Sequence, residues 1–292
     1  MIGATSVQDL RRLSGGASRE TWSFAADGRR LILRCDPPGA AKGGMNMESA
    51  LLRAAATAGV PVPDVIAAGD NWIVMAHVDG ETIARKILRD DEYAPARPKL
   101  AYQCGEILAA LHRIPTDVTP LEEPDQLATW RSSLDNLAQP HPAFELAFRW
   151  LTDNRPPSTR RTVIHGDFRN GNFIVGPEGV RAILDWELAH IGDPMEDLGW
   201  LCVNAWRFGV RDKPVGGFGD YDDLVSAYEA AGGGPVDRDA LRWWETLGTL
   251  KWGIMCILQA TAHTSGMIRS VELAAIGRRV CENEWDLLEM LP

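Results

Sequence analysis

The chain has 292 residues, of which 45% are hydrophobic and 24% charged, and its formal net charge is −10 at pH 7. This length is enough for one large domain or two lobes, and the composition is typical of a globular enzyme rather than a disordered chain. The acidic balance argues against nucleic acid or an anionic membrane as partner, because both favour basic surfaces. A neutral or cationic small substrate remains compatible with it.

The cysteines and apolar runs indicate the cellular compartment in which we expect the protein. The five cysteines are scattered along the chain, so neither a disulfide framework nor a CxxC metal site is predicted. The first 16 residues lack an apolar core of signal-peptide length, and the run WGIMCIL at residues 252–258 is too short to cross a bilayer. We therefore expect a cytoplasmic protein.

The first 78 residues are predicted to form mainly strands. Residues 10–16, 20–26 and 29–35 have strand character, with a turn at Asp27 and Gly28 between the last two. Residues 45–59 favour a helix that ends at Gly59, because the following VPVP cannot continue it. Residues 71–78 form another apolar strand, and residues 79–83 are the expected hinge.

Beyond Gly80 the helical period dominates. Residues 97–114 and 236–263 carry apolar side chains at helical spacing, whereas the proline-rich residues 115–142 are expected to be a surface connection. We predict an α+β chain in two parts. These are a small N-terminal lobe with an antiparallel sheet, residues 1–78, and a larger, mainly helical C-terminal lobe, residues 79–292.

Residues 162–187, TVIHGDFRNGNFIVGPEGVRAILDWE, place polar side chains among short apolar runs. The runs NFIV and VRAILDW flank the turn-forming GPEG and predict a β-hairpin. With residues 176–179 as its loop, Asn172 is expected opposite Ile183, and Asp185 two residues further along the same face. One amide oxygen and one carboxylate suit Mg²⁺, which takes its other ligands from water and phosphates. Asn172 and Asp185 are thus predicted magnesium ligands, and this metal implies a nucleotide.

Asp167 lies five residues before Asn172, at the end of the predicted strand TVIHGD. Its carboxylate is placed to receive a proton from an incoming hydroxyl group. An isolated His-x-Asp cluster is more often a set of hydrogen-bonded turn residues. The complete spacing, HxD followed by four residues and Asn and then by a hairpin ending in Asp, is more specific. It matches the catalytic loop and metal-binding Asp of kinase-like phosphotransferases.

In the form HGDFRNGN and ILDWE, this pattern resembles the aminoglycoside phosphotransferase and choline kinase family. The resemblance covers nearly the whole chain through LSGGASRETWSF, LILR, Glu48, VMAHVDG, the catalytic loop and DPMEDLGWL, in that order. It implies a bilobal protein-kinase-like fold with Asp167 as the catalytic base. Arg169 then corresponds to the position of a cation beside the transferred phosphate, and His165 to a structural residue of the loop.

The same resemblance assigns the nucleotide-binding side. Glycines between two predicted strands would let backbone amides approach the phosphates of ATP. This segment consists of Ser14, Gly15, Gly16, Ala17 and Ser18. Arg34 stands where related kinases use Lys and could pair with Glu48, although a solvated surface salt bridge is the alternative. Ala76 and Val78 would contact adenine through their main-chain groups.

Other residues of the motifs are expected to support the fold. Asp193 is a predicted N-cap with Pro194 as the first helical residue, and Asp197 resembles the family's buried acid that braces the catalytic loop. Five tryptophans either line a substrate pocket or, more commonly, belong to the core. They are Trp200, Trp206, Trp243, Trp244 and Trp252.

Together these patterns predict an ATP- and magnesium-dependent O-phosphotransferase that acts on a hydroxyl group of a small molecule. One alternative is a non-catalytic nucleotide-binding module, which would lack a base or a metal ligand. Another is a metal-dependent hydrolase, which would need more histidines near the site than His165 and His190. The C-terminal segment resembles the branch of the family associated with acyl-CoA dehydrogenases, and this implies hydroxyacyl acceptors.

Overall fold

The computed structural model describes residues 2–13, 19–37, 44–158 and 160–292. The predicted phosphate-binding residues Ser14, Gly15, Gly16, Ala17 and Ser18 lie outside these ranges. The strands are β1 Val7–Arg12, β2 Glu20–Ala26, β3 Arg29–Cys35, β4 Val65–Gly69, β5 Trp72–Ala76, β6 Thr162–Ile164, β7 Phe173–Gly176, β8 Gly179–Ile183 and β9 His190–Gly192. The α-helices are α1 Gly44–Ala58, α2 Ala84–Arg89, α3 Arg97–Leu111, α4 Gln126–Leu137, α5 Pro142–Asp153, α6 Met195–Cys202, α7 Tyr221–Ala230, α8 Arg238–Thr264, α9 Val271–Ile276 and α10 Val280–Met290. Short 3-10 helices are η1 Asp91–Tyr93, η2 Asn204–Arg207 and η3 Gly277–Arg279.

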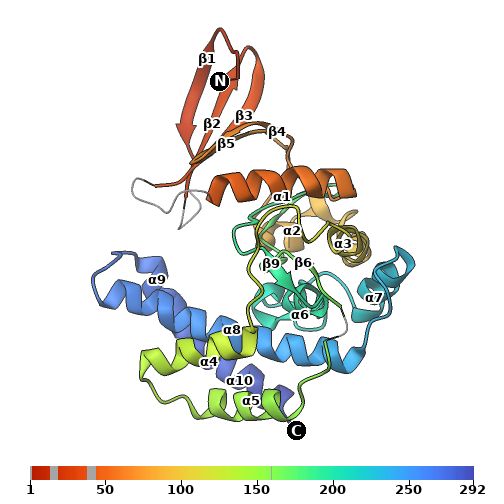
Figure 1. The fold of residues 1–292 in the computed structure, drawn as a ribbon, viewed down its shortest axis with the longest axis vertical. Helices are drawn as coiled ribbons and strands as arrows, with labels where there is room; N and C mark the ends of the chain where they lie inside the picture. Colours follow the sequence, from red (N-terminus) through yellow and green to blue (C-terminus); the bar gives the residue numbers. More distant parts are fainter. Residues whose placement is uncertain (1, 14–18, 38–43, 159) are drawn as a thin grey trace.

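The structure has a small sheet-containing lobe above a larger helical one, as the sequence predicts (Figure 1). The upper sheet has five antiparallel strands in the order β1-β2-β3-β5-β4. Asp27 and Gly28 both have positive φ, 49° and 78°, which is the backbone of a tight turn between twisted antiparallel strands. The predicted turn is therefore confirmed, and it sets the register of Arg34 on β3.

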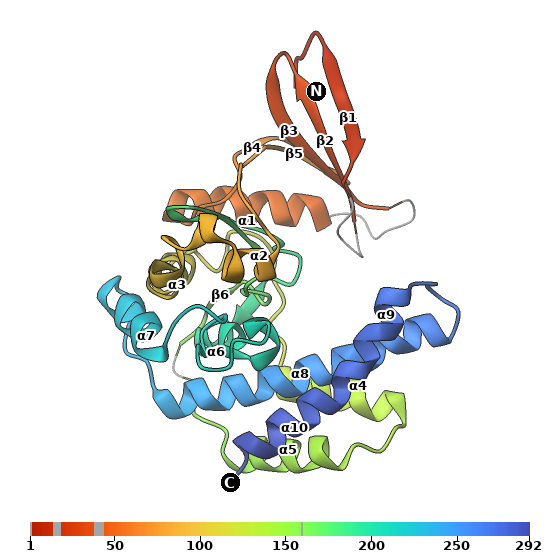
Figure 2. The ribbon, with the colours of Figure 1, turned by 180° about the vertical axis from the view of Figure 1, so that it is seen from behind.

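Helix α1 lies between this sheet and the lower lobe (Figures 1 and 2), and its Glu48 is buried. Its buried residues recur at helical spacing, and Met45, Leu51 and Ala55 join a core that includes Ile73 of β5. The same core continues into the lower lobe through residues such as Trp186. The two lobes thus share a hydrophobic core next to the catalytic loop, and the lobe boundary after residue 78 stays a prediction.

Helix α8 is the longest element of the lower lobe, with 27 residues, and it confirms the predicted helix at 236–263. It packs against α6, α9 and α10 (Figure 2), and Lys251 at the middle of its length contacts Gly166 of the catalytic loop. Within the described residues, no helix combines the length and apolar character that a membrane crossing requires.

Three local predictions need correction. The first strand begins at Val7 rather than residue 10. Residues 115–142 are not only a connection, because they include α4, which is capped by Asp125 and buries Leu127 and Leu134. Helix α6 starts at Met195, with Pro194 at the cap position. Asp193 still serves the helix start, since its carboxylate accepts a hydrogen bond from the Met195 N–H at 2.9 Å.

Candidate active site

The predicted catalytic loop, residues 165–172, follows β6 and is held by Asp197 of α6. The Asp197 carboxylate, fully buried, accepts hydrogen bonds from the N–H groups of His165 and Gly166 at 2.8 and 3.0 Å. Burial has the largest single influence on Asp197 and penalises its charged form, but the interactions with the His112 ring and with His165 together outweigh it and keep the Asp197 pKa below its ordinary value. The bracing role inferred for Asp197 agrees with this geometry.

His165 is a structural residue whose ring nitrogens are both engaged. Its Nε2 lies 3.0 Å from the Leu184 carbonyl oxygen and must donate to it, while Nδ1 accepts from the Asp167 N–H at 3.2 Å. Burial lowers the pKa of His165, and this agrees with a neutral ring carrying its proton on Nε2. The ring joins the catalytic loop to the chain after β8 and is not available as a metal ligand.

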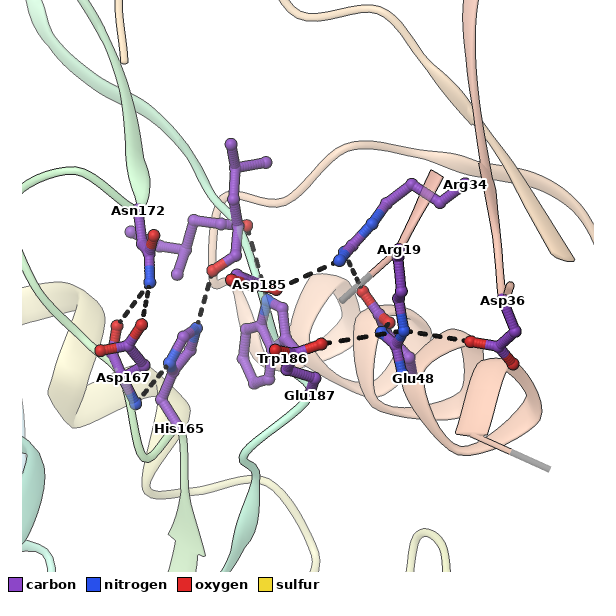
Figure 3. Close-up of polar contacts among 12 residues, drawn as sticks. Arg19, Arg34, Asp36, Glu48, His165, Asp167, Asn172, Asp185, Trp186 and Glu187 are labelled. Carbon is purple, nitrogen blue, oxygen red and sulfur yellow. Dashed lines mark hydrogen bonds and ion pairs between the residues drawn. The ribbon is translucent and has the colours of Figure 1, made fainter. Parts of the chain in front are cut away.

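Asp167 projects from this loop, and its carboxylate is held by three side chains, of which Figure 3 shows Asn172. Its Oδ1 accepts hydrogen bonds from Arg169 Nε at 2.9 Å and Trp200 Nε1 at 2.8 Å. Its Oδ2 accepts one from Asn172 Nδ2 at 2.6 Å. Because a carboxylate oxygen can accept two hydrogen bonds, Oδ2 keeps a lone pair for a further donor. The side chain is 14% exposed, which gives a small ligand access to it.

The predicted hairpin is present as β7 and β8, but its register differs by one residue from the prediction. Val175 pairs with Val180, whereas Ile174 pairs with Ala182, so Arg181 is an extra residue in β8. This bulge places Ile183 opposite Phe173, not opposite Asn172. The expectation that strand alternation aligns Asn172 with Asp185 was therefore wrong.

Asn172 and Asp185 are still neighbours at the open end of the hairpin. The Leu184 N–H donates to the Asn172 carbonyl at 2.8 Å, and Asp185 is the next residue. Asp185 has a φ of 67°, in the left-handed region, so its side chain leaves the strand pattern. The Asn172 amide turns its nitrogen to Asp167 and its oxygen away (Figure 3), which leaves that oxygen for another partner.

Arg34 and Glu48 meet in a mostly buried ion pair, with side chains only 15% and 1% exposed. This burial contradicts the alternative of a solvated surface salt bridge. Glu48 also pairs with Arg19, and burial raises the pKa of Glu48 although the two arginines oppose the shift. Arg34 Nη2 reaches Asp185 Oδ1 at 3.1 Å across the two lobes (Figure 3).

Arg19 extends this network and was not identified from the sequence. Its Nε lies 3.2 Å from Asp36 Oδ1 and 3.8 Å from Glu187 Oε2. The network of described residues therefore contains four carboxylates and two guanidinium groups. Their excess of negative charge and the oxygen donors of Asn172 and Asp185 fit a hard divalent cation such as Mg²⁺.

Arg169, Trp200 and Trp206 lie next to one another beside the catalytic loop. The Arg169 guanidinium lies over the Trp206 ring, 4.5 Å from its centroid. Trp200, Trp206, Trp243 and Trp252 are buried in the core, which is the more common of the two readings given above. Trp200 also donates to Asp167, a direct contact that sequence reasoning did not anticipate. Trp244 is only partly buried.

Ala76 and Val78 lie where β5 leaves the sheet toward the lower lobe. The N–H of Ala76 donates to the Asp64 carbonyl at 2.9 Å, so Ala76 can offer only its carbonyl to a nucleotide base.

The metal-dependent hydrolase alternative receives no support. Across the described ranges there is no group of three or more His, Cys, Asp or Glu residues arranged to hold a metal.

Lys251 is a second residue that the sequence analysis missed. It lies on α8, is only 6% exposed, and its Nζ donates to the Gly166 carbonyl at 3.1 Å. A signal was present, because Lys251 is the single charged residue in the apolar stretch LGTLKWGIMCIL. A lysine in such a position needs a partner in the fold.

The chain matches a family described as the phosphotransferase enzyme family over residues 9–244. Acyl-CoA dehydrogenase family member 10 from Mus musculus is 30% identical over an alignment of 241 residues, which covers 75% of this chain. The chain spans only 22% of the length of that relative.

Two solved structures show the same fold. One is a candidate aminoglycoside phosphotransferase from Ralstonia eutropha JMP134, with a TM-score of 0.76, 22% identity and coverage of 96% of this chain and 92% of the other. The second is the aminoglycoside phosphotransferase APH(4)-Ia in complex with AMP-PNP and hygromycin B, with a TM-score of 0.67, 16% identity and coverage of 98% and 93%. These likenesses confirm the predicted bilobal kinase-like fold.

Proposed function

The chain belongs to the phosphotransferase enzyme family. On this premise we propose that it is a small-molecule kinase, which transfers the γ-phosphate of ATP, with Mg²⁺, to a hydroxyl group of its substrate. The observation that carries the proposal is the Asp167 carboxylate. Three donors orient it, and Asn172 connects it to the open end of the hairpin, where the proposed metal ligands lie. An oriented carboxylate beside a candidate metal site is the arrangement that phosphoryl transfer to an alcohol requires.

In the proposed reaction, Asp167 Oδ2 receives the proton of the substrate hydroxyl group. The hydroxyl oxygen forms a bond to the γ-phosphorus, the bond from that phosphorus to the β–γ bridging oxygen breaks, and ADP leaves. Arg169 donates a hydrogen bond from its Nε to Asp167, and its guanidinium group lies over the Trp206 ring. Its other N–H groups can therefore contact the transferred phosphoryl group. The base and this cation are thereby held as one unit.

The nucleotide is proposed to lie between the lobes. The Asn172 amide oxygen and the Asp185 carboxylate would hold Mg²⁺, which supplies charge neutralisation of the phosphates when bound. Arg34, already facing Asp185, would contact the phosphates together with the backbone amides of Ser14 to Ser18. The carbonyl of Ala76 and the main chain of Val78 would contact adenine. The AMP-PNP complex of a structurally similar protein supports a nucleotide between the lobes.

The acceptor is proposed to be a hydroxyacyl thioester rather than an aminoglycoside. The side chains that contact Asp167 are a cation, an indole and an amide. A polycationic aminoglycoside would require carboxylates at this position. The similarity to a relative named as an acyl-CoA dehydrogenase points to the same class of acceptor.

A coupled ADP-release screen tests the proposal. Aminoglycosides, choline-type alcohols, macrolides and hydroxyacyl thioesters would be offered with ATP and Mg²⁺, and the Asp167→Asn variant would serve as the blank. We expect acceptor-dependent ADP release with hydroxyacyl compounds and little with aminoglycosides. Release with aminoglycosides alone would contradict the acceptor assignment, and release without any acceptor dependence would contradict the proposed transfer.

A further inference from the structure

The peptide unit that joins Gly166 to Asp167 is held at both of its polar atoms. Its N–H, which belongs to Asp167, donates to His165 Nδ1 at 3.2 Å. Its carbonyl, which belongs to Gly166, accepts from Lys251 Nζ at 3.1 Å. Gly166 has a φ of 80°, and a Cβ there would collide with the Leu188 carbonyl oxygen. The direction of this carbonyl, toward α8, therefore depends on glycine at position 166.

Lys251 also supports the residue that holds the Asp167 side chain. Its ammonium group lies 4.4 Å from the centroid of a Trp200 ring, within the range of a cation–π contact. The Nε1 of the same tryptophan donates to Asp167 Oδ1 at 2.8 Å. One lysine thus reaches Asp167 by two routes, through its backbone and through the indole beside its carboxylate.

The cost of burying this ammonium group indicates a role beyond packing. Removing a charge from water costs several kcal/mol unless partners compensate for it. Here the partners are the Gly166 carbonyl, the Trp200 face and Glu196, whose Oε1 lies 3.8 Å from Nζ. An apolar residue of similar length would avoid this cost in a helix that is otherwise buried here. The arrangement couples α8 to the loop that carries the base.

We propose that Lys251 is a positioning residue, which sets the orientation of Asp167 for phosphoryl transfer through the Gly166 carbonyl and the Trp200 ring. This inference rests on the proposed function of Asp167. It assigns to α8 a role in turnover that is separate from its role in the core. A base displaced by about 1 Å can lose about 10²-fold in rate, so the effect of losing Lys251 should appear in kcat.

The test compares Lys251→Met with a control on the same helix. Lys251→Met is expected to lower kcat by roughly 10- to 100-fold while the KM for ATP and nucleotide affinity stay near wild type. Ile254→Ala is the control, because Ile254 is fully buried in the α8 core but has no polar link to the loop. It should lower the thermal midpoint through a cavity and leave kcat near the wild-type value below that temperature.

Two further variants distinguish positioning from loss of fold. The double variant Lys251→Met with Glu196→Gln removes the lysine together with the buried Glu196 charge, whose other partner is His190 at 3.1 Å, so it keeps the test valid if the single variant unfolds. Trp200→Phe removes the indole N–H but keeps a ring. In the double variant Lys251→Met with Trp200→Phe, the fold-decrease in kcat should be smaller than the product of the two single decreases, because both residues act on Asp167.

Hydrogen exchange of the loop gives a readout that needs no acceptor. Amides of the peptide covering residues 162–172 should exchange faster in Lys251→Met than in wild type, with or without bound nucleotide. Unchanged loop exchange and wild-type kcat in a folded Lys251 variant would overturn the inference, even if Asp167→Asn abolishes transfer. Transfer that survives in Asp167→Asn would instead overturn the proposed function.

Discussion

The nucleotide side of the site and the catalytic loop are held in place by different interactions. On the nucleotide side, Arg19 and Arg34 are held by carboxylates from both lobes. In the catalytic loop, backbone groups bond to Asp197 and His165 inside a buried core. The first set of charges can exchange partners when a metal and phosphates arrive, whereas the second set is already in position. The comparison indicates a rigid base facing an adaptable nucleotide site.

The largest effect on stability is expected when the rigid side loses its support. Asp197→Ala leaves the N–H groups of His165 and Gly166 without their partner. The free energy of unfolding should fall by about 3 kcal/mol, because each buried unpaired donor costs about 1–3 kcal/mol. Urea denaturation measures it. Asp193→Ala, which removes a cap of the same helix, is the control and should cost about 1 kcal/mol. Equal losses in the two variants would mean that Asp197 has no special role in the loop.

On the adaptable side, Asp185→Ala should remove most of the magnesium dependence of nucleotide binding while the fold survives. The affinity for ATP in the presence of Mg²⁺ is expected to fall by about 100-fold, toward the value without the metal, because a carboxylate ligand is lost. Calorimetry with and without Mg²⁺ measures this. Asp70→Ala, which removes an exposed carboxylate near α1, is the matched control for charge. A magnesium effect that persists in Asp185→Ala would exclude this residue as a ligand.

A smaller effect is expected from Arg34→Ala. The KM for ATP should rise by roughly 10-fold and turnover should fall, because an anchored cation that orients the phosphates is lost. Arg34→Lys keeps the charge but cannot bridge Glu48 and Asp185 in the same way, so its kinetics should be intermediate. Steady-state kinetics at varied ATP decide the matter. If Arg34→Ala has the wild-type kcat and KM for ATP, the Arg34–Glu48 ion pair is a structural contact without a role in nucleotide binding.

The smallest effect on turnover concerns Glu245, a buried carboxyl group of α8. Burial raises the pKa of Glu245 to about 7, although Arg207 and Tyr221 stabilise its charge. The folded protein therefore holds this proton more tightly than the unfolded chain. Its contribution to stability is fully present below about pH 4.5 and is lost as the pH rises through about 7.

Glu245→Gln should remove this pH dependence. The difference in unfolding free energy between pH 5 and pH 8 is expected to shrink by about 1–3 kcal/mol, with kcat little changed. Urea denaturation at both pH values measures it. An unchanged pH dependence would show that another buried group is responsible.

Local patterns in the sequence predicted the parts of the site that are close in the chain. Asp167, Asn172 and Asp185 lie within one segment whose strand and turn residues indicate a hairpin. The bulge at Arg181 was not predictable, since no glycine or proline marks it and it depends on pairing in the folded sheet. The missed helix α4 follows prolines that suggested a connection, although Asp125 provides a capping signal.

Contacts between distant segments required the structure. Arg34 and Asp185 are 151 residues apart, and Lys251 and Gly166 are 85 apart, so no local periodicity connects them. The role of Trp200 was open for a similar reason, because a buried tryptophan of the core and a donor to Asp167 give the same sequence pattern. Chemistry could be predicted from residue types, but the network that orients the base depends on how α6 and α8 pack.

The most direct test of a rigid base facing an adaptable nucleotide site is the Asp167→Asn variant, with single-turnover phosphoryl transfer and magnesium-ATP binding measured in parallel. The substitution keeps the size of the side chain and removes the proton acceptor. Transfer should fall by roughly 10²- to 10⁴-fold, while magnesium-ATP affinity should change little. Transfer near the wild-type rate would contradict the assignment of Asp167 as the base, and a collapse of magnesium-ATP binding would place Asp167 in the metal site instead.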